Sequence, residues 1–345
     1  MKLKTPISVV TALVLSTLAT VPGASAQSIE LRAADSFPTG HYIANNLAKA
    51  FMVSVGEKTA GKVTFKYFPA QQLGKAADLL SLTQSGVTDI GYVGPSYVSD
   101  KMPLSSVGQL PEAFNTACEG TKAYWEIAKP GGILDKAEFA PNGIRLLMAM
   151  VLPPYNLVTS DRKITGLDSI KGLKIRSTGG AMDLAVRKIG GVPVQMPAPE
   201  VREALSRGTI DGGLFPNPSI LPYGMEAFLK YGTQGINFGS FVATYVISIK
   251  RWNELPPEIQ ETMTKVGKTA TLAACKVADE LDISNMKTLI KGGVVYADLP
   301  EAAAAKVTGL LGTVSSEWAA DLDTKGKKGT EILKAFRAAL KNPVD

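Results

Sequence analysis

Apolar positions in the first third of the chain follow two periods, which together predict an α/β unit. Short stretches rich in branched or aromatic residues predict strands at residues 29–34, 63–68 and 89–93. Between them, residues 41–57 and 76–85 carry apolar side chains at three- and four-residue steps, which predicts helices. This alternation is typical of a mainly parallel sheet with helices on its faces.

The same alternation begins again further along the chain and predicts a second unit. A chain of 345 residues has room for both, so we expect two α/β lobes. Ligands of open α/β sheets bind beyond the carboxyl ends of the strands, which makes the cleft between the lobes the expected site. The elements predicted for the second unit are strands at residues 144–150, 156–159, 173–176 and 192–194, helices at 181–189 and 199–206, and a turn at 208–212 into another strand.

One predicted helix is long enough to run along both lobes. Residues 241–249 are strongly strand-like, and Pro256 and Pro257 follow them. Apolar residues then recur at helical spacing, and no proline occurs from 258 to 299. A helix ending near Ile290 would measure about 45 Å, which exceeds one small domain. Residues 302–340 predict further helices.

The first 26 residues have the order of a secretory signal. Lys2 and Lys4 precede an uncharged, mostly apolar run at residues 7–21, and small residues follow at 24–26. The run is shorter than the roughly 20 residues of a membrane anchor and is broken by Thr and Ser. We therefore favour a cleaved signal over an anchor, with Gln27 as the first mature residue.

The charge and the cysteine content limit which partners and which covalent links we expect. The formal net charge of +6 becomes +4 once the signal is removed, and its spread is compatible with attracting anions. The densest basic cluster, residues 325–328, is interpreted as a solvated helix start, so no nucleic-acid partner is expected. Cys118 and Cys275 lie far apart in sequence. Export permits a disulfide, but two buried thiols are the favoured interpretation.

The sequence carries no legible catalytic or metal-binding motif. His41 is the only histidine, and neither cysteine belongs to a motif with it. HExxH, CxxC, EF-hand and Gly-x-Ser-x-Gly patterns do not occur. Residues 267–269 look like the end of a phosphate-binding loop, but Thr262 stands where that loop needs glycine. We therefore expect no cofactor, no metal and no catalysis.

Arg176 is the main candidate for ligand binding. It ends a predicted strand within residues 172–180, GLKIRSTGG, and small residues and a helix at Ala181 follow. A guanidinium group can bind both oxygens of a carboxylate. The small residues allow close approach, and the helix start adds N–H donors. On these grounds alone, a strand-end arginine is more often a surface salt-bridge partner.

A second segment, residues 204–217, offers an aromatic wall and an amide. Gly208 and the pair Gly212-Gly213 indicate a helix end and tight turns. Phe215 and Asn217 follow directly. From the residues alone, ordinary core packing explains Phe215 equally well.

Several segments, taken in order, resemble the extracytoplasmic solute receptors of tripartite ATP-independent periplasmic (TRAP) transporters. Each match is weak alone, but the complete order is specific and covers almost the whole mature chain. The matching segments are YFPAQQLG at 67–74, GVTDI at 86–90, LPEAF at 110–114, LDSIKGLKIR at 167–176, GVPV at 191–194 and EVREALSRGTIDG at 200–212.

The resemblance implies an α/β, two-lobed periplasmic binding protein fold, a long helix bridging both lobes, and a location in the periplasm. Lobe I would comprise residues 27–152 plus about 240–280, and lobe II residues 153–239 plus about 281–345 with the C-terminal helices. Ligand would enter the cleft, and the closed form would dock on TRAP membrane subunits. We expect a monomeric receptor.

The resemblance also implies which side chains bind the ligand. Arg176 matches the arginine that binds the ligand carboxylate in this family. Other members place pocket side chains shortly after the Asp-Gly pair and on the strand that enters the second lobe; strand ends of the first lobe supply the rest. The predicted binding residues are Arg176, Asn217, Phe215, Tyr155, Tyr92 and Phe37.

Two departures from the family pattern narrow the range of ligands that we expect. Sialic-acid receptors carry Glu-Asn just after Asp-Gly-x, where Leu214 and Phe215 stand here. Their second arginine has no counterpart in residues 151–155, VLPPY. A sugar acid is therefore not expected. A single arginine among aromatic residues suits a small organic acid anion, a monocarboxylate with an apolar or aromatic body.

Two other functions stay open on sequence grounds. A secreted enzyme is disfavoured by the single histidine and the lack of a nucleophile motif. A sensory receptor that presents its closed form to a signalling protein would share every feature above. The sequence does not separate that role from transport.

Overall fold

The computed structural model describes residues 1, 28–111 and 114–342. The predicted signal, residues 1–26, lies outside the described residues except for Met1, and so do two positions of the LPEAF segment. Within the described ranges, no helix combines the length and the apolar character needed to cross a membrane.

The first sheet has the strand order β2-β1-β3-β10-β4. Its first three strands pair in parallel, and β10 pairs antiparallel with both β3 and β4. Strand β10, which comes from the second half of the chain, therefore lies inside the first sheet. Its pairing connects the two halves of the chain. The strands are β1 (Ile29–Ala34), β2 (Val63–Phe68), β3 (Ile90–Val93), β4 (Ile144–Val151) and β10 (Val242–Ser248).

Helices cover this sheet, and the predicted helix at 41–57 is split. Its first part, η1, is a π-helix that continues into an α-helix, α1. The apolar face is unchanged, because Leu47, Phe51 and Val55 are all buried in the core. The helices of this lobe are η1 (Ala44–Lys49), α1 (Ala50–Lys58), α2 (Leu79–Gln84), η2 (Pro95–Val98), η3 (Leu104–Gln109), α3 (Ala117–Ala128), η4 (Asp135–Phe139) and α8 (Ile249–Asn253).

The second sheet has the order β11-β9-β5-β8-β6-β7, with β5 antiparallel to its two neighbours. Two of its strands, β9 and β11, were not predicted, because each is short and half polar. The elements are β5 (Asn156–Thr159), α4 (Leu167–Ile170), β6 (Lys174–Ser177), α5 (Ala181–Lys188), β7 (Val192–Gln195), α6 (Ala198–Ser206), β8 (Gly212–Phe215), α7 (Asn217–Ile220), η5 (Glu226–Phe228), β9 (Tyr231–Gln234) and β11 (Val295–Asp298).

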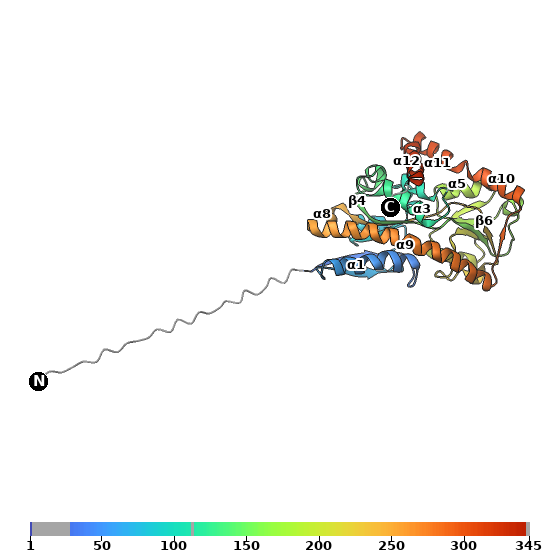
Figure 1. Ribbon diagram of the computed structural model, residues 1–345. Helices are drawn as coiled ribbons and strands as arrows, with labels where there is room; N and C mark the ends of the chain where they lie inside the picture. Colours follow the sequence, from blue (N-terminus) through green and yellow to red (C-terminus); the bar gives the residue numbers. More distant parts are fainter. Residues whose placement is uncertain (2–27, 112–113, 343–345) are drawn as a thin grey trace.

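The long helix α9 (Pro257–Lys291) runs along both lobes, as Figure 1 shows in orange. It packs against α1, α3 and β4 beside the first sheet and against α7 beside the second. Met263, Val266 and Ala270 are buried on one face, at the predicted spacing. The predicted two-lobed α/β fold with a long bridging helix is confirmed.

The C-terminal helices α10 (Glu301–Leu311), α11 (Val314–Thr324) and α12 (Gly329–Lys341) return across the molecule. Helix α10 contacts α4 and α5 beside the second sheet, and α11 contacts α5 and α12. Helix α12 packs against α3 and η3 beside the first sheet. Helix α12 thus lies beside helices α3 and η3 of lobe I, and the predicted division of the chain into lobes stays a prediction.

Cys118 and Cys275 form a disulfide, which corrects the interpretation that favoured free thiols. Their Cα atoms lie 4.8 Å apart, across 157 residues of sequence. The bond joins the start of α3 to the middle of α9. The sequence could not show this because only the packing of α3 on α9 brings the two side chains together.

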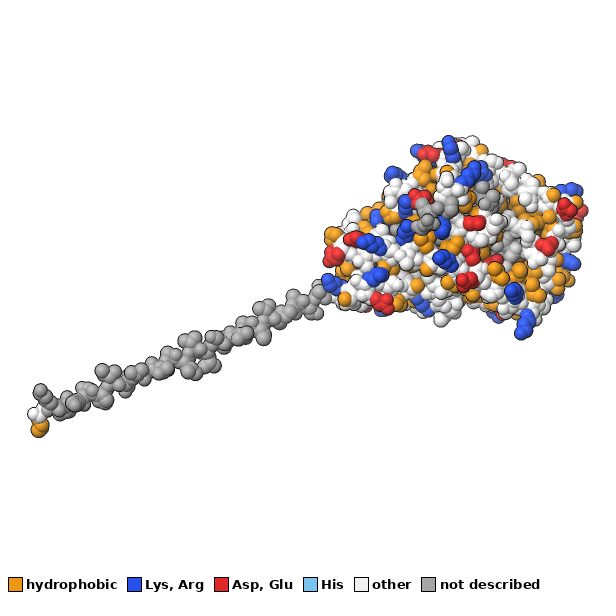
Figure 2. Space-filling model, viewed as in Figure 1, with side chains coloured by type: hydrophobic (Ala, Val, Ile, Leu, Met, Phe, Trp, Pro, Cys, Tyr) orange, Lys and Arg blue, Asp and Glu red, His pale blue; other side chains and the backbone are white. Residues whose placement is uncertain are grey.

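The surface carries charges of both signs. In Figure 2, lysine and arginine side chains are interspersed with aspartate and glutamate over the visible face. Many of them pair one helical turn apart, such as Lys265 with Glu261 and Lys325 with Asp321. Exposed pairs of this kind contribute little to stability.

Candidate ligand-binding site

A small cavity lies between the two lobes and receives side chains from both. We call it the interlobe cavity. Its volume, about 20 Å³, is enough for about one water molecule. The lobes are therefore closed on each other in this structure. The lining residues are Phe37, His41, Tyr92, Tyr97, Leu152 and Phe241 from lobe I, and Tyr155, Arg176, Ala198, Phe215, Ser219 and Tyr223 from lobe II.

Arg176 is buried in the wall of this cavity, with 1% of its surface exposed. Its Nε donates to the carbonyl of Met196 at 3.1 Å, and Nη1 donates to that of Leu214 at 3.2 Å. Nη2 donates to the Tyr97 hydroxyl at 3.3 Å. These acceptors are neutral, and no acidic side chain in the described part of the chain pairs with Arg176. The surface salt-bridge alternative is thereby excluded within that part.

The bonds to Arg176 leave its terminal nitrogens with donors to spare. A guanidinium carries five N–H groups; the three bonds above use three of them, and the Tyr155 hydroxyl is a further side-chain partner of Arg176. The guanidinium group lies over the ring of Phe215, with Cζ 4.3 Å from the ring centroid. Gly213, which pairs with Arg176 in the sheet, makes room for this stack, since a Cβ there would lie 3.1 Å from both the Arg176 Cβ and the Phe215 ring. The guanidinium group of Arg176 is therefore held in a fixed orientation at the cavity wall, and no acidic side chain of the described chain neutralises its charge.

The structure brings five of the six predicted binding residues together. Arg176 and Phe215 lie on adjacent strands, and Tyr155 stacks parallel to Phe215 with ring centroids 6.3 Å apart. Tyr92, at the end of β3, lies 4.6 Å from Phe37 between ring centroids. All five line the interlobe cavity.

Asn217, the sixth, lies elsewhere. Its Oδ1 accepts hydrogen bonds from Tyr296 Oη at 2.8 Å and from Asn156 Nδ2 at 3.2 Å. Its backbone N–H donates to Asp282 of the bridging helix at 3.2 Å. The residue lines a separate groove on the other side of the β5 strand, with Asn156 and Asp282. Its side chain thus joins α7 to α9 rather than facing the cavity.

Asp282 makes stability depend on pH at this junction. Burial raises its pKa to about 6, although the bonds from Asn217 oppose the rise. In the unfolded chain, the Asp282 carboxyl has a pKa of about 3.9. Its contribution to the free energy of unfolding is therefore fully present below that pH and is lost as the pH rises through about 6. We expect Asp282→Asn to raise the free energy of unfolding by about 2 kcal/mol more at pH 7.5 than at pH 4.5. Urea unfolding of both proteins at the two pH values measures this difference; an equal effect at both would contradict it.

Sequence reasoning missed several lining residues. Tyr97 accepts from Arg176 and also from the Ala198 N–H at 3.1 Å, so it links lobe I to two elements of lobe II. It follows the end of β3, and His41 follows the turn after β1; position at a strand end could have indicated both. Tyr223 carries no such signal, because it reaches the cavity through an irregular loop.

Three tyrosines of the cavity stay protonated because they are buried. Burial raises the pKa of Tyr92, Tyr155 and Tyr223 well above the ordinary value. Below the cavity, Asp35 accepts hydrogen bonds from Tyr67 Oη at 2.6 Å and Tyr245 Oη at 2.7 Å. Burial also raises the pKa of Asp35. The cavity therefore combines one cation with neutral aromatic groups.

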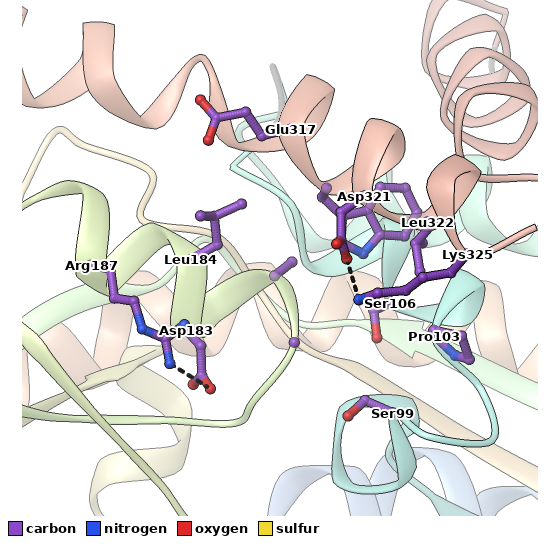
Figure 3. A pocket seen from close by; sticks show the side chains of 13 residues that line it. Ser99, Pro103, Ser106, Asp183, Leu184, Arg187, Glu317, Asp321, Leu322 and Lys325 are labelled. Carbon is purple, nitrogen blue, oxygen red and sulfur yellow. Dashed lines mark hydrogen bonds and ion pairs between the residues drawn. The ribbon is translucent and has the colours of Figure 1, made fainter. Parts of the chain in front are cut away.

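A larger groove, with a volume of about 490 Å³, lies between α5, α11 and the η2–η3 segment (Figure 3). Its cations are already paired. Lys325 binds Asp321 at 2.6 Å, and Arg187 lies 3.8 Å from Asp183. No aromatic wall encloses the groove, and Trp318 is its single aromatic lining residue. The groove is thus a weaker candidate for a small organic anion than the interlobe cavity.

No cluster of three or more His, Cys, Asp or Glu side chains suited to a metal ion is present within residues 28–111 and 114–342. The polar side chains that line the interlobe cavity are those of Arg176, His41, Ser219 and the tyrosines.

Comparison with known proteins places this geometry in a family. The profile of bacterial extracellular solute-binding protein family 7 matches residues 34–320. A TRAP solute-binding protein from Rhodoferax ferrireducens, solved with copurified benzoate, superposes with a TM-score of 0.83 at 22% identity, covering 91% of this chain and 98% of that one.

Two further solved structures share the fold. A TRAP periplasmic solute-binding protein from Bordetella bronchiseptica with bound mandelate has a TM-score of 0.82 at 24% identity, covering 91% and 99% of the two chains. An extracytoplasmic solute receptor from Bordetella pertussis that binds pyroglutamic acid has a TM-score of 0.80 at 23% identity, covering 90% and 100%. All three hold small organic acids.

Proposed function

The chain belongs to family 7 of the bacterial extracellular solute-binding proteins, and we propose that it is the periplasmic receptor of a TRAP transporter for a monocarboxylate with an aromatic or apolar body. Members of this family are solute-binding proteins, not enzymes, and we propose no catalytic role. We further propose that the receptor acts as a monomer and passes its ligand to TRAP membrane subunits.

The observation that carries the proposal is a buried arginine with no acidic partner in the described chain, set among aromatic rings. An unpaired charge in a closed cavity is costly unless a ligand of opposite charge neutralises it. A carboxylate that bonds both terminal nitrogens of Arg176 does so in the planar geometry that guanidinium favours. Phe215 and Tyr155 then flank the body of the ligand.

The charge balance favours one carboxylate over two. Arg176 is the only cationic side chain among the residues that line the interlobe cavity. A second carboxylate would be buried among phenol and phenyl rings without a cation, and that costs several kcal/mol. Benzoate and mandelate, bound by the Rhodoferax and Bordetella bronchiseptica proteins, are acids of the favoured type.

Closure of the lobes completes the site. The cavity holds about one water, so a ligand enters only when the lobes separate. On closure, Tyr97 of lobe I reaches Arg176 and Ala198 of lobe II. We propose that the lobes close again around the ligand at a wider spacing than here, and that this ligand-bound form docks on the membrane subunits.

Gly179 is expected to be needed for closure. It has a φ of +95°, and a Cβ there would lie 2.5 Å from the end of the Gln195 side chain in lobe II, which can move aside, and 3.2 Å from the backbone oxygen of Ser96 in lobe I, which cannot. We expect Gly179→Ala to weaken ligand binding about tenfold, because the added methyl group opposes the closed form. Gly180→Ala is the matched control: its φ of +58° gives similar strain, but its Cβ would meet only the Ser106 Oγ, at 3.9 Å. Calorimetric titration should separate the two variants, and equal affinities would count against a closing contact at Gly179.

The ligand class is tested by calorimetry on protein exported to the periplasm and freed of copurified ligand by unfolding and refolding. Benzoate, mandelate and phenylacetate are compared with succinate, galacturonate and pyroglutamate. We expect aromatic monocarboxylates to bind about 100-fold more tightly than dicarboxylates or sugar acids. If dicarboxylates or sugar acids bound and no aromatic monocarboxylate did, the proposal would be overturned.

A further inference from the structure

His41 lines the interlobe cavity, and one of its two ring nitrogens has no hydrogen-bond partner in the described part of the chain. Its ring is fully buried, at the start of the helical segment that follows β1. The Nδ1 atom accepts a hydrogen bond from the Ile43 N–H at 3.2 Å. An acceptor nitrogen carries no proton, so the neutral ring must carry its proton on Nε2. Burial lowers the pKa of His41 to about 3, which keeps this neutral form across the physiological range.

The Nε2–H group has no hydrogen-bond partner in the described part of the chain. Buried polar groups are nearly always bonded, and an orphaned donor in a binding cavity calls for a partner supplied by a ligand or a water molecule. The His41 ring is fully buried, so this donor does not reach bulk solvent.

The ring is held in place by its neighbours. It stacks between Phe37 and Tyr42, with centroid distances of 4.6 Å and 4.7 Å, and Tyr223 lies 5.3 Å away at an angle of 59°. Together with the Nδ1 bond, this stack fixes the direction of the N–H group. His41 belongs to lobe I and Arg176 to lobe II, so a ligand between the lobes meets both.

We propose that His41 Nε2–H donates a hydrogen bond to a neutral oxygen on the body of the ligand, remote from the carboxylate that Arg176 binds. This inference rests on the proposed function and narrows it to ring-oxygenated aromatic acids, with a hydroxyl, methoxy or keto oxygen. A neutral donor attracts such an oxygen without supplying the second cation that another carboxylate would need. His41 is then the residue that discriminates among aromatic monocarboxylates.

The test compares acids of equal size on the native protein and on variants. The 2-, 3- and 4-hydroxybenzoates are titrated against the corresponding methylbenzoates, with methoxybenzoates as acceptors that cannot donate. We expect at least one hydroxy isomer, and a methoxy isomer, to bind the native protein about tenfold more tightly than its methyl counterpart, the effect of one hydrogen bond.

His41→Phe keeps a stacking ring without the donor and should abolish this preference, so that the hydroxy, methoxy and methyl isomers bind the variant with equal affinity. His41→Gln places an amide N–H at a similar reach and should retain part of the preference. The inference would be overturned if the native protein preferred the methyl isomer at every ring position. It would also be overturned if the preference for the hydroxy or methoxy isomer survived in His41→Phe. Either result would leave the proposed function intact. Absence of binding of every aromatic monocarboxylate would instead overturn the proposed function, and the inference with it.

Discussion

Arg176→Ala is expected to weaken binding of the carboxylate ligand by about 30- to 5,000-fold, with the fold intact. Truncating one partner of a buried, hydrogen-bonded charge pair costs about 2–5 kcal/mol, much of it the penalty for leaving the other charge unpaired. Here the cost falls on the ligand carboxylate, because Arg176 is the only cation that lines the interlobe cavity. Isothermal titration with the best-binding acid measures the change.

Two further variants separate charge from geometry at this position. Arg176→Lys keeps the charge but loses the planar fork and the stack on Phe215, so an intermediate loss is expected. Arg202→Ala is the matched control. Arg202 also lies over an aromatic ring, that of Phe228 at 5.5 Å, but outside the cavity, and its removal should leave affinity unchanged. Native affinity in a folded Arg176→Ala protein would refute the assignment.

Removing the Cys118–Cys275 disulfide is expected to lower the free energy of unfolding by about 3–5 kcal/mol. The bond closes a loop of 157 residues, and constraining so long a loop removes much conformational freedom from the unfolded chain. At this chain length, the change corresponds to a melting temperature lower by roughly 5 °C. Denaturant unfolding of the Cys118→Ala/Cys275→Ala protein measures the effect.

A reductant supplies the control for this prediction. Adding it should destabilise the native protein by a similar amount and leave the double variant unchanged. Ligand affinity should stay within about threefold of native in the variant, because neither cysteine lines the interlobe cavity. Native stability after full reduction would contradict the prediction.

The local elements were largely predictable from the sequence, because each depends on a pattern of neighbouring residues. The strands at 29–34 and 63–68 occur with the predicted bounds, since branched and aromatic side chains alternate there. The long helix was predictable from its opening prolines and its uninterrupted apolar spacing, and it spans Pro257–Lys291. Strands β9 and β11 were not, because short half-polar stretches form strands only when a neighbouring strand pairs with them.

The candidate site was partly predictable for a similar reason. The resemblance pointed to Arg176 and Phe215, which lie on adjacent strands of lobe II, and to Tyr155, which directly precedes strand β5. It also pointed to Asn217, two residues beyond Phe215. The Asn217 side chain does not face the interlobe cavity and instead bonds Tyr296 and Asn156. Which side such a residue faces depends on how the chain turns into α7, and that is set by packing against α9.

By itself, then, the sequence determined the α/β class, the two units, the long helix and the arginine, because these rest on local periodicity and on short ordered motifs. Only the tertiary structure decided that Arg176 is buried without an acidic partner in the described chain, that Cys118 meets Cys275, and that His41 brings an unpaired donor to the same cavity. Each of these depends on contacts between segments far apart in the chain. No local pattern encodes them, because they form only when the two lobes and the bridging helix pack together.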